Sequence, residues 1–375
     1  MKILVLGGTG VISTAVVKLC NEKGLDVTCI NRGNKTDENE KLGITVFKCD
    51  LNNKEGISAY LNDKQYDVVL DFLCYREKNI ADHLDLLKNK VGQYILISTD
   101  SVYKVKDDGS YYIEGDELGN PIWSYSVGKI ECENYLVSFC EKNKINWTIV
   151  RPAITFGNTR IPYGLMPDVG FHYFLVNRIK CGKYIPEWNH GNNVATMVRS
   201  EDFAKLFVPL IGNREAYGEI YNVCGDEYIS NREILDYVSA YVGENVKTVN
   251  VEIDDILSLF KERVGEFAVD RAHDHKVSNA KIKKLSGEAP SISVKDGIAM
   301  TLAYYESNNY LRGIDYFFDG RIDRIINDSK EVKEKQRFRN YQGGSYLKHR
   351  LKYFKGYHFD SKLLTAIRQL YHKFR

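Results

Sequence analysis

Short apolar segments alternate with amphipathic ones along the first 150 residues, which is typical of a parallel sheet covered by helices. Runs rich in apolar and β-branched residues predict strands at 2–6, 26–31, 45–48, 67–72, 93–98 and 147–150. Apolar positions at helical spacing predict helices up to about residue 23, over 79–88 and from 125 to about 143. Right-handed crossovers between such strands produce a doubly wound α/β sheet of the Rossmann type, which is the fold that we expect.

The same pattern divides the chain into three predicted parts. Residues 1–155 form the dinucleotide-binding core, to which later segments can return, and residues 156–314 form a smaller substrate-binding lobe. Residues 315–375 form a basic, aromatic C-terminal extension. The overall net charge of +2 conceals this division, because residues 321–375 contain 15 Lys and Arg against 5 Asp and Glu, a net charge of +10. The preceding residues keep 37 basic and 45 acidic side chains, a net charge of −8.

Two stretches of the extension, 348–355 and 363–371, interleave basic residues with apolar and aromatic ones, as helices on membrane surfaces do. The charges favour a basic helix that packs on the protein's own acidic body. Contact with a membrane surface, with a protein partner or with RNA remains an alternative for this extension.

The composition is that of a soluble globular protein, with 43% hydrophobic and 27% charged residues and a mean hydropathy of −0.36. The N-terminal apolar run, 3–6, is too short for a signal peptide, and no apolar run is long enough to span a bilayer. We therefore expect a cytoplasmic protein, located at the inner face of the membrane if the extension binds lipid. Eight cysteines without a Cys-x-x-Cys pair indicate reduced thiols. His273 and His275 lack a third ligand at a recognisable spacing, so we expect a solvated loop there and no metal site.

A glycine-rich segment lies between the first predicted strand and the first predicted helix. In such a segment the pyrophosphate of a dinucleotide meets backbone N–H groups and the positive end of the helix. Glycine permits the tight turn and the close approach of the backbone. On this basis we assign to the cofactor Gly7, Thr9, Gly10, Val11 and Ile12. Ser13 stands where a third glycine is commoner, a change that a small residue can tolerate.

The second predicted strand ends at Asn31 and Arg32, where an acidic residue would bind the ribose of NAD. No carboxylate stands there to repel a 2′-phosphate, and the Arg32 guanidinium can bind one. This end of the strand therefore favours NADP over NAD as the cofactor. Asp50 and Leu51, which close the third predicted strand, are expected near the adenine.

Tyr125 and Lys129 are four residues apart in a predicted helix, so their side chains lie on one face. An ammonium near a phenol favours the ionised phenol, which can then transfer a proton near neutral pH. Thr99 follows the fifth predicted strand and places a hydroxyl at the carboxyl edge of the sheet, where ligands of such sheets bind. These three side chains form the candidate catalytic group.

Several motifs occur together along the chain: Gly7-Gly-Thr-Gly10, Asp50-Leu51, Ser98-Thr-Asp-Ser-Val-Tyr103, Tyr125-x-x-x-Lys129, Arg151-Pro152-x-x-x-Phe156-Gly157 and Tyr221-Asn222-Val223-x-Gly225. With them, residues 1–310 resemble the extended short-chain dehydrogenase/reductase family, also called the NAD-dependent epimerase/dehydratase family. The resemblance implies that Tyr125 moves a proton on a sugar hydroxyl or ketone and that Thr99 hydrogen-bonds the reacting oxygen. It also implies that Lys129 holds the nicotinamide ribose and lowers the pKa of Tyr125, and that Pro152 packs near the nicotinamide.

Two departures from the family pattern concern the substrate. Sugar-nucleotide 4,6-dehydratases typically have a glutamate where this chain has Ser101, so we expect dehydration to be disfavoured. Ala195 stands where many nucleotide-sugar epimerases have a diphosphate-binding arginine, and Arg199 stands where they have a histidine. The candidate substrate contacts are Asp100, Ser101 and Arg199. The other cations that can replace the missing arginine are Arg160, Arg178 and Arg271.

The leading hypothesis is an NAD(P)-dependent sugar epimerase or ketoreductase, with neither activity preferred. Its substrate is expected to be a nucleotide-linked sugar, and the protein is expected to form a homodimer without a nucleic-acid partner. The alternative is a non-catalytic or RNA-binding relative that uses the dinucleotide fold and the basic extension.

Overall fold

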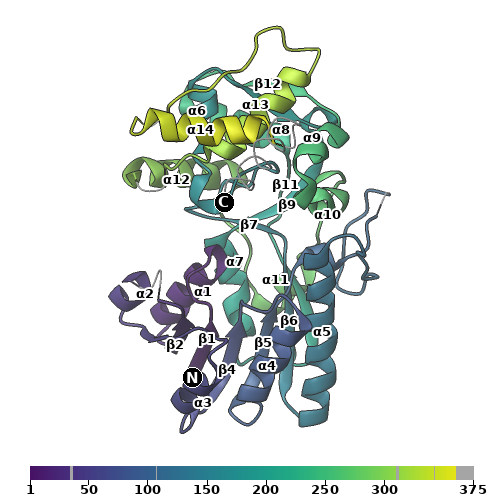
Figure 1. Cartoon of the computed structure of the whole chain (residues 1–375). Helices are drawn as coiled ribbons and strands as arrows, with labels where there is room; N and C mark the ends of the chain where they lie inside the picture. The colour runs from purple at the N-terminus through teal and green to yellow at the C-terminus, as the bar shows by residue number, and fades with distance from the viewer. Residues whose placement is uncertain (34–36, 107, 310–311, 342, 360–375) are drawn as a thin grey trace, which may run out of the picture. The chain divides into compact units, whose positions relative to one another are not determined.

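A computed structural model describes residues 1–33, 37–106, 108–309, 312–341 and 343–359, and the chain groups into two compact units. The residues of unit 1 are Met1–Gly157, Ala195–Tyr228 and His273–Val294. The residues of unit 2 are Asn158–Val194, Ile229–Ala272 and the described positions from Lys295 onward. This grouping returns two later segments to the first unit and places the described part of the extension in the second (Figure 1).

Unit 1 contains a seven-stranded parallel sheet in the order β10-β6-β5-β4-β1-β2-β3. Its strands are β1 (Lys2–Leu6), β2 (Asp26–Asn31), β3 (Thr45–Lys48), β4 (Tyr66–Asp71), β5 (Val91–Ile97), β6 (Asn146–Pro152) and β10 (Glu219–Val223). The order reverses at β1, which lies between β2 and β4, so the doubly wound sheet is confirmed. Six of these strands are the predicted ones to within two residues, and β10 was not predicted.

Both faces of this sheet are buried under helices, which are α1 (Val11–Glu22), α2 (Asp37–Lys41), α3 (Lys54–Leu61), α4 (Glu77–Leu87), α5 (Ser124–Asn143), α7 (Ser200–Phe207) and α11 (Ala280–Ser286). Ile3 and Val5 belong to the apolar cluster that includes residues of α1 and α7. Leu4 and Leu6 belong to the cluster with residues of α3, α4 and α5. Successive strand residues point to opposite faces, so a strand covered on both sides is apolar throughout.

Shorter elements of unit 1 follow the strands of the sheet. The 3₁₀ turn η1 (Asp100–Val102) comes directly after β5, and β7 (Ile154–Phe156) follows β6. β7 pairs in parallel with β9 (Val194–Arg199), with Ile154 opposite Met197. The remaining short elements of this unit are η4 (Val208–Leu210) and η5 (Arg214–Ala216), and β11 (Tyr228–Ser230) begins at the last residue of this segment of unit 1.

Unit 2 is mainly helical, with a two-stranded parallel ladder of β8 (Tyr184–Glu187) and β12 (Lys247–Asn250). Its main helices are α6 (Phe174–Lys180), α8 (Asn231–Val242), α9 (Ile253–Leu259), α12 (Val294–Ser307), α13 (Tyr316–Asp328) and α14 (Tyr346–Tyr357). The shorter helical turns are η2 (Val169–Phe171), η3 (Asn189–Gly191), η6 (Lys261–Arg263), α10 (Val264–Glu266) and η7 (Phe267–Arg271). A capping box of Ser230 and Glu233 begins α8, and Gly243 in the left-handed conformation ends it.

A buried cluster of charges holds α13 within unit 2. Arg178 Nη1 lies 2.6 Å from Asp319 Oδ1 and 2.8 Å from Asp323 Oδ1. Lys183 Nζ lies 2.6 Å from Asp323 Oδ2 and 3.1 Å from Asp319 Oδ2. Tyr353 on α14 donates a further hydrogen bond to Asp323 at 2.7 Å. The extension therefore packs through its own carboxylates against basic residues of the preceding chain.

This cluster bears on two expectations. The predicted packing of a basic helix, 348–355, on an acidic body stays a prediction, because the buried ion pairs of the extension are made by Asp319 and Asp323 of α13, outside that stretch. Arg178 is fully buried and paired within this cluster, so it is not the cation that replaces the missing arginine. The second basic stretch, 363–371, lies outside the described residues. In the part of the chain that the structure describes, no helix is both long and apolar enough to cross a membrane.

Candidate functional site

The glycine-rich turn joins β1 to α1, and its backbone conformation leaves no room for a side chain at Gly7. Gly7 has φ of +88°, and a Cβ there would lie 2.6 Å from Leu73 Cγ. The Gly10 N–H donates to the buried Ser13 hydroxyl at 2.8 Å, so Ser13 closes the turn in place of a third glycine. Val11 and Ile12 begin α1, where backbone N–H groups lack helical acceptors and favour an anion.

Asn31, at the end of β2, supports this turn. Its Oδ1 accepts a hydrogen bond from the Gly8 N–H at 2.8 Å. Its Nδ2 is buried and has no hydrogen-bond partner among the described residues, which leaves one donor available at the predicted ribose position. Arg32 is exposed beside it. Asp50 is also exposed and accepts two hydrogen bonds from Asn52, while Leu51 packs against the apolar cluster beneath.

Lys129 lies on α5 with only 2% of its side chain exposed. Its Nζ donates to the Ile97 carbonyl at the end of β5, at 2.8 Å. The same atom lies 4.8 Å from the centre of the Tyr75 ring and 5.9 Å from the centre of the Tyr125 ring. Burial lowers the pKa of Lys129 below its ordinary value, because the charged form loses its hydration.

Tyr125 is half-buried on the first turn of α5, between aromatic neighbours. Its ring centre lies 5.0 Å from that of Trp123 and 6.4 Å from that of Tyr75. Gly128 allows this approach, because a Cβ there would overlap the Tyr75 carbonyl oxygen. Glycine therefore positions α5 close to the loop that follows β4.

Thr99 and its neighbours form a tight polar turn directly after β5. The buried Thr99 hydroxyl accepts from the Ser101 N–H at 3.3 Å, and its Oγ1 lies 3.3 Å from Asp100 Oδ1. The Ser126 hydroxyl on α5 donates to the Ser101 carbonyl at 2.8 Å. The structure thus brings the Thr99 turn and the Tyr125 helix to the same carboxyl edge of the sheet.

His275 is the residue that sequence reasoning misplaced. The expected solvated loop is wrong at this position, because only 3% of His275 is exposed. Its Nε2 lies 3.2 Å from Asp100 Oδ2, and its ring stacks on Tyr112 with centres 4.5 Å apart. His275 and Val277 alternate with the more polar Lys276 and form β-bridges to Ala195 and Tyr112. That short alternation is the signal that would have predicted burial.

Pro152 is buried at the end of β6, and Arg151 directly precedes it. The buried Arg151 pairs with Glu133 of α5, with Nη2 and Oε2 2.6 Å apart. Asn222 on β10 accepts a hydrogen bond from the Tyr103 hydroxyl at 2.7 Å. Two motifs of the predicted family therefore help to hold the surrounding loops on the sheet.

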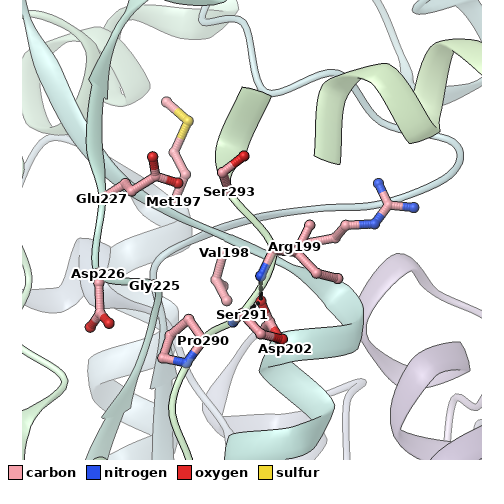
Figure 2. Close-up of a pocket in the computed structure, with 11 residues that line it drawn as sticks. Met197, Val198, Arg199, Asp202, Gly225, Asp226, Glu227, Pro290, Ser291 and Ser293 are labelled. Atoms are coloured by element: carbon pink, nitrogen blue, oxygen red, sulfur yellow. Dashed lines mark hydrogen bonds between the residues drawn. The ribbon is translucent and has the colours of Figure 1, made fainter. Parts of the chain in front are cut away.

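A pocket of about 200 Å³ lies elsewhere in unit 1 (Figure 2). It is lined by Met197, Val198, Arg199, Asp202, Gly225, Asp226, Glu227, Pro290, Ser291, Ile292 and Ser293. Arg199 is buried and its Nε lies 3.0 Å from Glu201 Oε2, and in Figure 2 its side chain extends away from Asp226 and Glu227. The lining includes none of the candidate catalytic residues, so this pocket does not join Arg199 to Tyr125.

Asp71, Cys74 and His83 form a buried group beneath the turn, with potential ligand atoms within 4.8 Å of one another. These atoms are already bonded to each other: Asp71 Oδ2 lies 2.7 Å from His83 Nδ1 and 2.8 Å from Cys74 Sγ, and it also accepts from Tyr94. Burial alone would raise the pKa of Asp71, but His83 and the hydrogen bonds outweigh burial and lower it, so the carboxylate is ionised. All eight cysteines are free, and only Cys49 and Cys181 are partly exposed.

The sequence profile of the NAD dependent epimerase/dehydratase family matches residues 3–224. The chain belongs to this family. The match covers β1 to β10, including the glycine-rich turn, Thr99, Tyr125 and Lys129, so the predicted family is confirmed.

Curated members of the family match at low identity. The chain is 28% identical over 241 residues to the chloroplast stem-loop binding protein of 41 kDa b of Arabidopsis thaliana, covering 61% of this chain and 60% of that protein. It is 22% identical over 381 residues to dTDP-glucose 4,6-dehydratase 1 of Escherichia coli K12, covering 89% and 100%. The chain spans about 60% of the length of the curated relatives that match it first. Because several relatives are 4,6-dehydratases, they do not support the expectation that dehydration is disfavoured.

Solved structures of the family share the fold. UDP-glucose 4-epimerase of Thermus thermophilus, in complex with NAD, superposes with a TM-score of 0.67 at 19% identity, covering 82% of this chain and 100% of that one. UDP-glucuronic acid 4-epimerase of Bacillus cereus, in complex with UDP-glucuronic acid and NAD, gives 0.66 at 19% identity, covering 82% and 99%. The Rossmann-like sheet and the C-terminal lobe of this family member are thereby confirmed.

Proposed function

We propose that the protein is an NAD(P)-dependent epimerase or ketoreductase of a nucleotide-linked sugar, with Tyr125 as its acid and base. The observation that carries this proposal is the state of Lys129. A buried ammonium is costly unless it is paired, and its hydrogen bond within the described chain goes to the neutral Ile97 carbonyl. Packing alone gives no reason to keep that charge beside the Tyr125 ring.

The residues fit the steps of such a reaction. A bound nicotinamide supplies a hydride acceptor and donor, which is the chemistry that family members complexed with NAD have available. Tyr125 takes the hydroxyl proton as the carbinol carbon is oxidised, and it returns a proton to the oxygen when the ketone is reduced. The Lys129 charge favours the phenolate form of Tyr125, and Thr99 hydrogen-bonds the same substrate oxygen. Reduction on the opposite face gives an epimer, and reduction of a supplied ketone gives an alcohol.

The turn after β1 fits a dinucleotide. Gly7 leaves no side chain in the turn, the start of α1 provides N–H donors, and Asn31 Nδ2 is a buried donor without a partner in the described chain. Arg32 is the proposed ligand of a 2′-phosphate. Arg32→Ala is expected to weaken NADP binding about ten- to a hundredfold, the worth of a charge-assisted hydrogen bond, with little effect on NAD. Equal changes in the dissociation constants of both cofactors, measured by fluorescence titration, would contradict this role.

The decisive experiment replaces the phenol. Tyr125→Phe is expected to reduce turnover about 10²- to 10⁴-fold while cofactor binding is kept, because only proton transfer is removed. Tyr135→Phe is the matched control, since Tyr135 is also half-buried on α5. Native mass spectrometry identifies the bound nucleotide, and nicotinamide absorbance follows turnover on a panel of nucleotide sugars, including dTDP-glucose, and 4-keto sugars. Retained turnover in Tyr125→Phe would remove the assignment.

RNA binding is the second candidate function, because one relative of this chain is named a stem-loop binding protein. Fluorescence anisotropy with a stem-loop RNA and a scrambled single strand tests it. Binding to the stem-loop that persists in Tyr125→Phe, without turnover on any sugar, would favour this candidate. A homodimer is still a prediction, which light scattering on the purified protein checks.

A further inference from the structure

Among the described residues, the helix α14 contacts the rest of unit 2 through one side. Tyr353 is buried and donates a hydrogen bond to Asp323 of α13 at 2.7 Å. Gly356 lies so close to α13 that a Cβ would overlap the Phe317 carbonyl oxygen. Residues 353 and 356 are three apart and therefore lie on the same face of the helix. The attached face is thus fixed, and the opposite face has a defined orientation on unit 2.

That opposite face carries an exposed apolar stripe. Leu347 is 71% exposed, Leu351 is 61% exposed and Phe354 is 37% exposed. Their spacing of four and three residues places them in one row along the helix. Large apolar side chains exposed in a row are uncommon on a soluble surface and mark an interaction site.

Basic side chains border this stripe on both sides. At 100° per residue, Arg350 lies between the stripe and the buried face on one side, and Lys348, Lys352 and Lys355 lie on the other. All four are exposed. Residues 335–359 contain seven Lys and Arg and no Asp or Glu. The outward face therefore combines an apolar row with positive charge that no acidic residue within 335–359 opposes.

We propose that the outward face of α14 binds the surface of an anionic lipid membrane. A helix that lies in the membrane interface buries an apolar row at the boundary of headgroups and acyl chains, and its flanking cations contact lipid phosphates. Leu347, Leu351 and Phe354 are the apolar row, and the long stems of the flanking lysines allow their charges to reach the headgroups. The binding is peripheral, in keeping with the lack of a membrane-crossing helix in the described residues.

The chemistry of the face favours lipid over the other occupants. Single-stranded nucleic acid is bound by stacking successive bases on aromatic rings beside cations, and in this row only Phe354, its least exposed member, carries a ring. A stable protein interface buries about 800 Å² on each partner, whereas three side chains on one helix form a narrow row. A lipid surface needs only that row and the surrounding positive charge. This proposal does not depend on the proposed catalytic function.

The test is flotation of the full chain with vesicles of phosphatidylcholine containing phosphatidylglycerol, compared with vesicles of phosphatidylcholine alone. Most of the protein is expected to float with the anionic vesicles, and high salt is expected to release it. Leu347→Ser with Leu351→Ser is expected to lower the bound fraction at least tenfold, as is the triple change Lys348→Gln, Lys352→Gln and Lys355→Gln. The matched controls are Ile122→Ser with Val264→Ser, and Lys142→Gln, Lys295→Gln and Lys333→Gln, all at exposed positions.

Several outcomes would overturn the proposal. The proposal is wrong if the wild-type chain does not float, or if it floats equally with neutral vesicles. It is also wrong if flotation of the leucine variant is unchanged. If a chain ending at Phe359 floats and the full chain does not, residues 360–375 cover the face. If wild-type protein forms dimers that the leucine variant cannot form, the occupant is a second copy. Loss of stem-loop RNA binding in the lysine variant alone, without flotation of the wild type, would identify a nucleic-acid surface. Equal thermal unfolding of all variants confirms that each one is folded.

Discussion

Both units bury basic side chains, but the buried cations contact carboxylates in unit 2 and a backbone carbonyl in unit 1. In unit 2, Arg178 and Lys183 are matched by two carboxylates, Asp319 and Asp323, at 2.6 to 3.1 Å. Burial alone would lower the pKa of Arg178, but these carboxylates outweigh it and raise the pKa. In unit 1, Lys129 is about equally buried and its pKa is lowered, because the loss of hydration outweighs the attraction of nearby groups that include Asp71 and Glu133. Its hydrogen bond in the described chain goes to a backbone carbonyl, with no carboxylate in direct contact.

The difference is the one expected between charges that stabilise a fold and a charge that serves the proposed reaction. A matched cluster joins two segments far apart in sequence, and each member is needed to satisfy the others. A cation without a carboxylate in direct contact contributes less to stability, and in the proposed reaction it acts on the neighbouring Tyr125. Variants of the two sites should therefore fail in different assays.

The largest expected effect is on the stability of unit 2. Arg178→Met leaves Asp319 and Asp323 buried with Lys183 as the one remaining cation of the described cluster, and it should lower the free energy of unfolding by about 3–5 kcal/mol. Arg337→Met, at an exposed position, is the control and should change it by less than about 0.5 kcal/mol. Urea unfolding followed by circular dichroism measures both. A small loss in Arg178→Met would show that the cluster is not a stabilising contact.

The matched change in unit 1 should have the reverse pattern. Lys129→Met should lower turnover at least about 10²-fold, because the phenol of Tyr125 loses the adjacent charge. The free energy of unfolding should change by less than about 1 kcal/mol or increase, since an apolar side chain replaces a buried charge that has no carboxylate in direct contact. Steady-state kinetics and urea unfolding of the same preparation provide the two measurements. A large loss of stability in Lys129→Met would abolish the contrast between the units.

Substitution of two glycines tests whether loss of close helix packing lowers stability equally in both units. Gly128 of α5 and Gly320 of α13 each lie where a Cβ would overlap a carbonyl oxygen, that of Tyr75 or of Tyr353. Gly128→Ala and Gly320→Ala should each destabilise the protein by about 1–3 kcal/mol through overpacking. Gly119→Ala, with open space around it, is the control. Only Gly128→Ala should also reduce turnover, and equal activity of both variants would dissociate the α5 position from the reaction.

The smallest effect is a pair of opposed pH dependences. Burial lowers the pKa of His172 in unit 2 to about 3, so stability should fall as the pH decreases below 6.5, by about 1 kcal/mol from pH 7 to 5.5. In unit 1 burial is outweighed by Asp71, which raises the pKa of His83. That contribution is present below 6.5 and is lost as the pH rises through the raised pKa. The free energy of unfolding, measured across this pH range, should lose the decrease below pH 6.5 in His172→Gln. In His83→Gln it should lose the decrease at higher pH.

The sequence predicted unit 1 well because its elements depend on local patterns. A strand buried on both faces is apolar throughout, and a turn that binds phosphate needs glycine, so β1 and Gly7 to Gly10 are visible without tertiary information. Tyr125 and Lys129 are visible because their spacing on one helix is informative by itself.

The misplaced features depend on contacts between distant segments. His275 is buried by its pairing with Ala195 and by Asp100, which stands 175 positions earlier. The buried ion pairs of the extension were also not predicted, because net charge does not say which charges are buried, and Asp319 and Asp323 are a minority within a basic segment. The amino-acid composition of a segment therefore predicts its net charge but not which of its side chains are buried in contacts.

The positions of the partly exposed thiols allow each unit to be labelled at one cysteine. Six of the eight cysteines are buried, which leaves Cys49 in unit 1 and Cys181 in unit 2 partly open to solvent. A single reaction with a maleimide dye pair should therefore place one fluorophore on each unit without any added cysteine. Energy transfer between them would report how the distance between the units responds to a nucleotide or to a sugar. Since Cys49 directly precedes Asp50, its label should also sense a bound adenine.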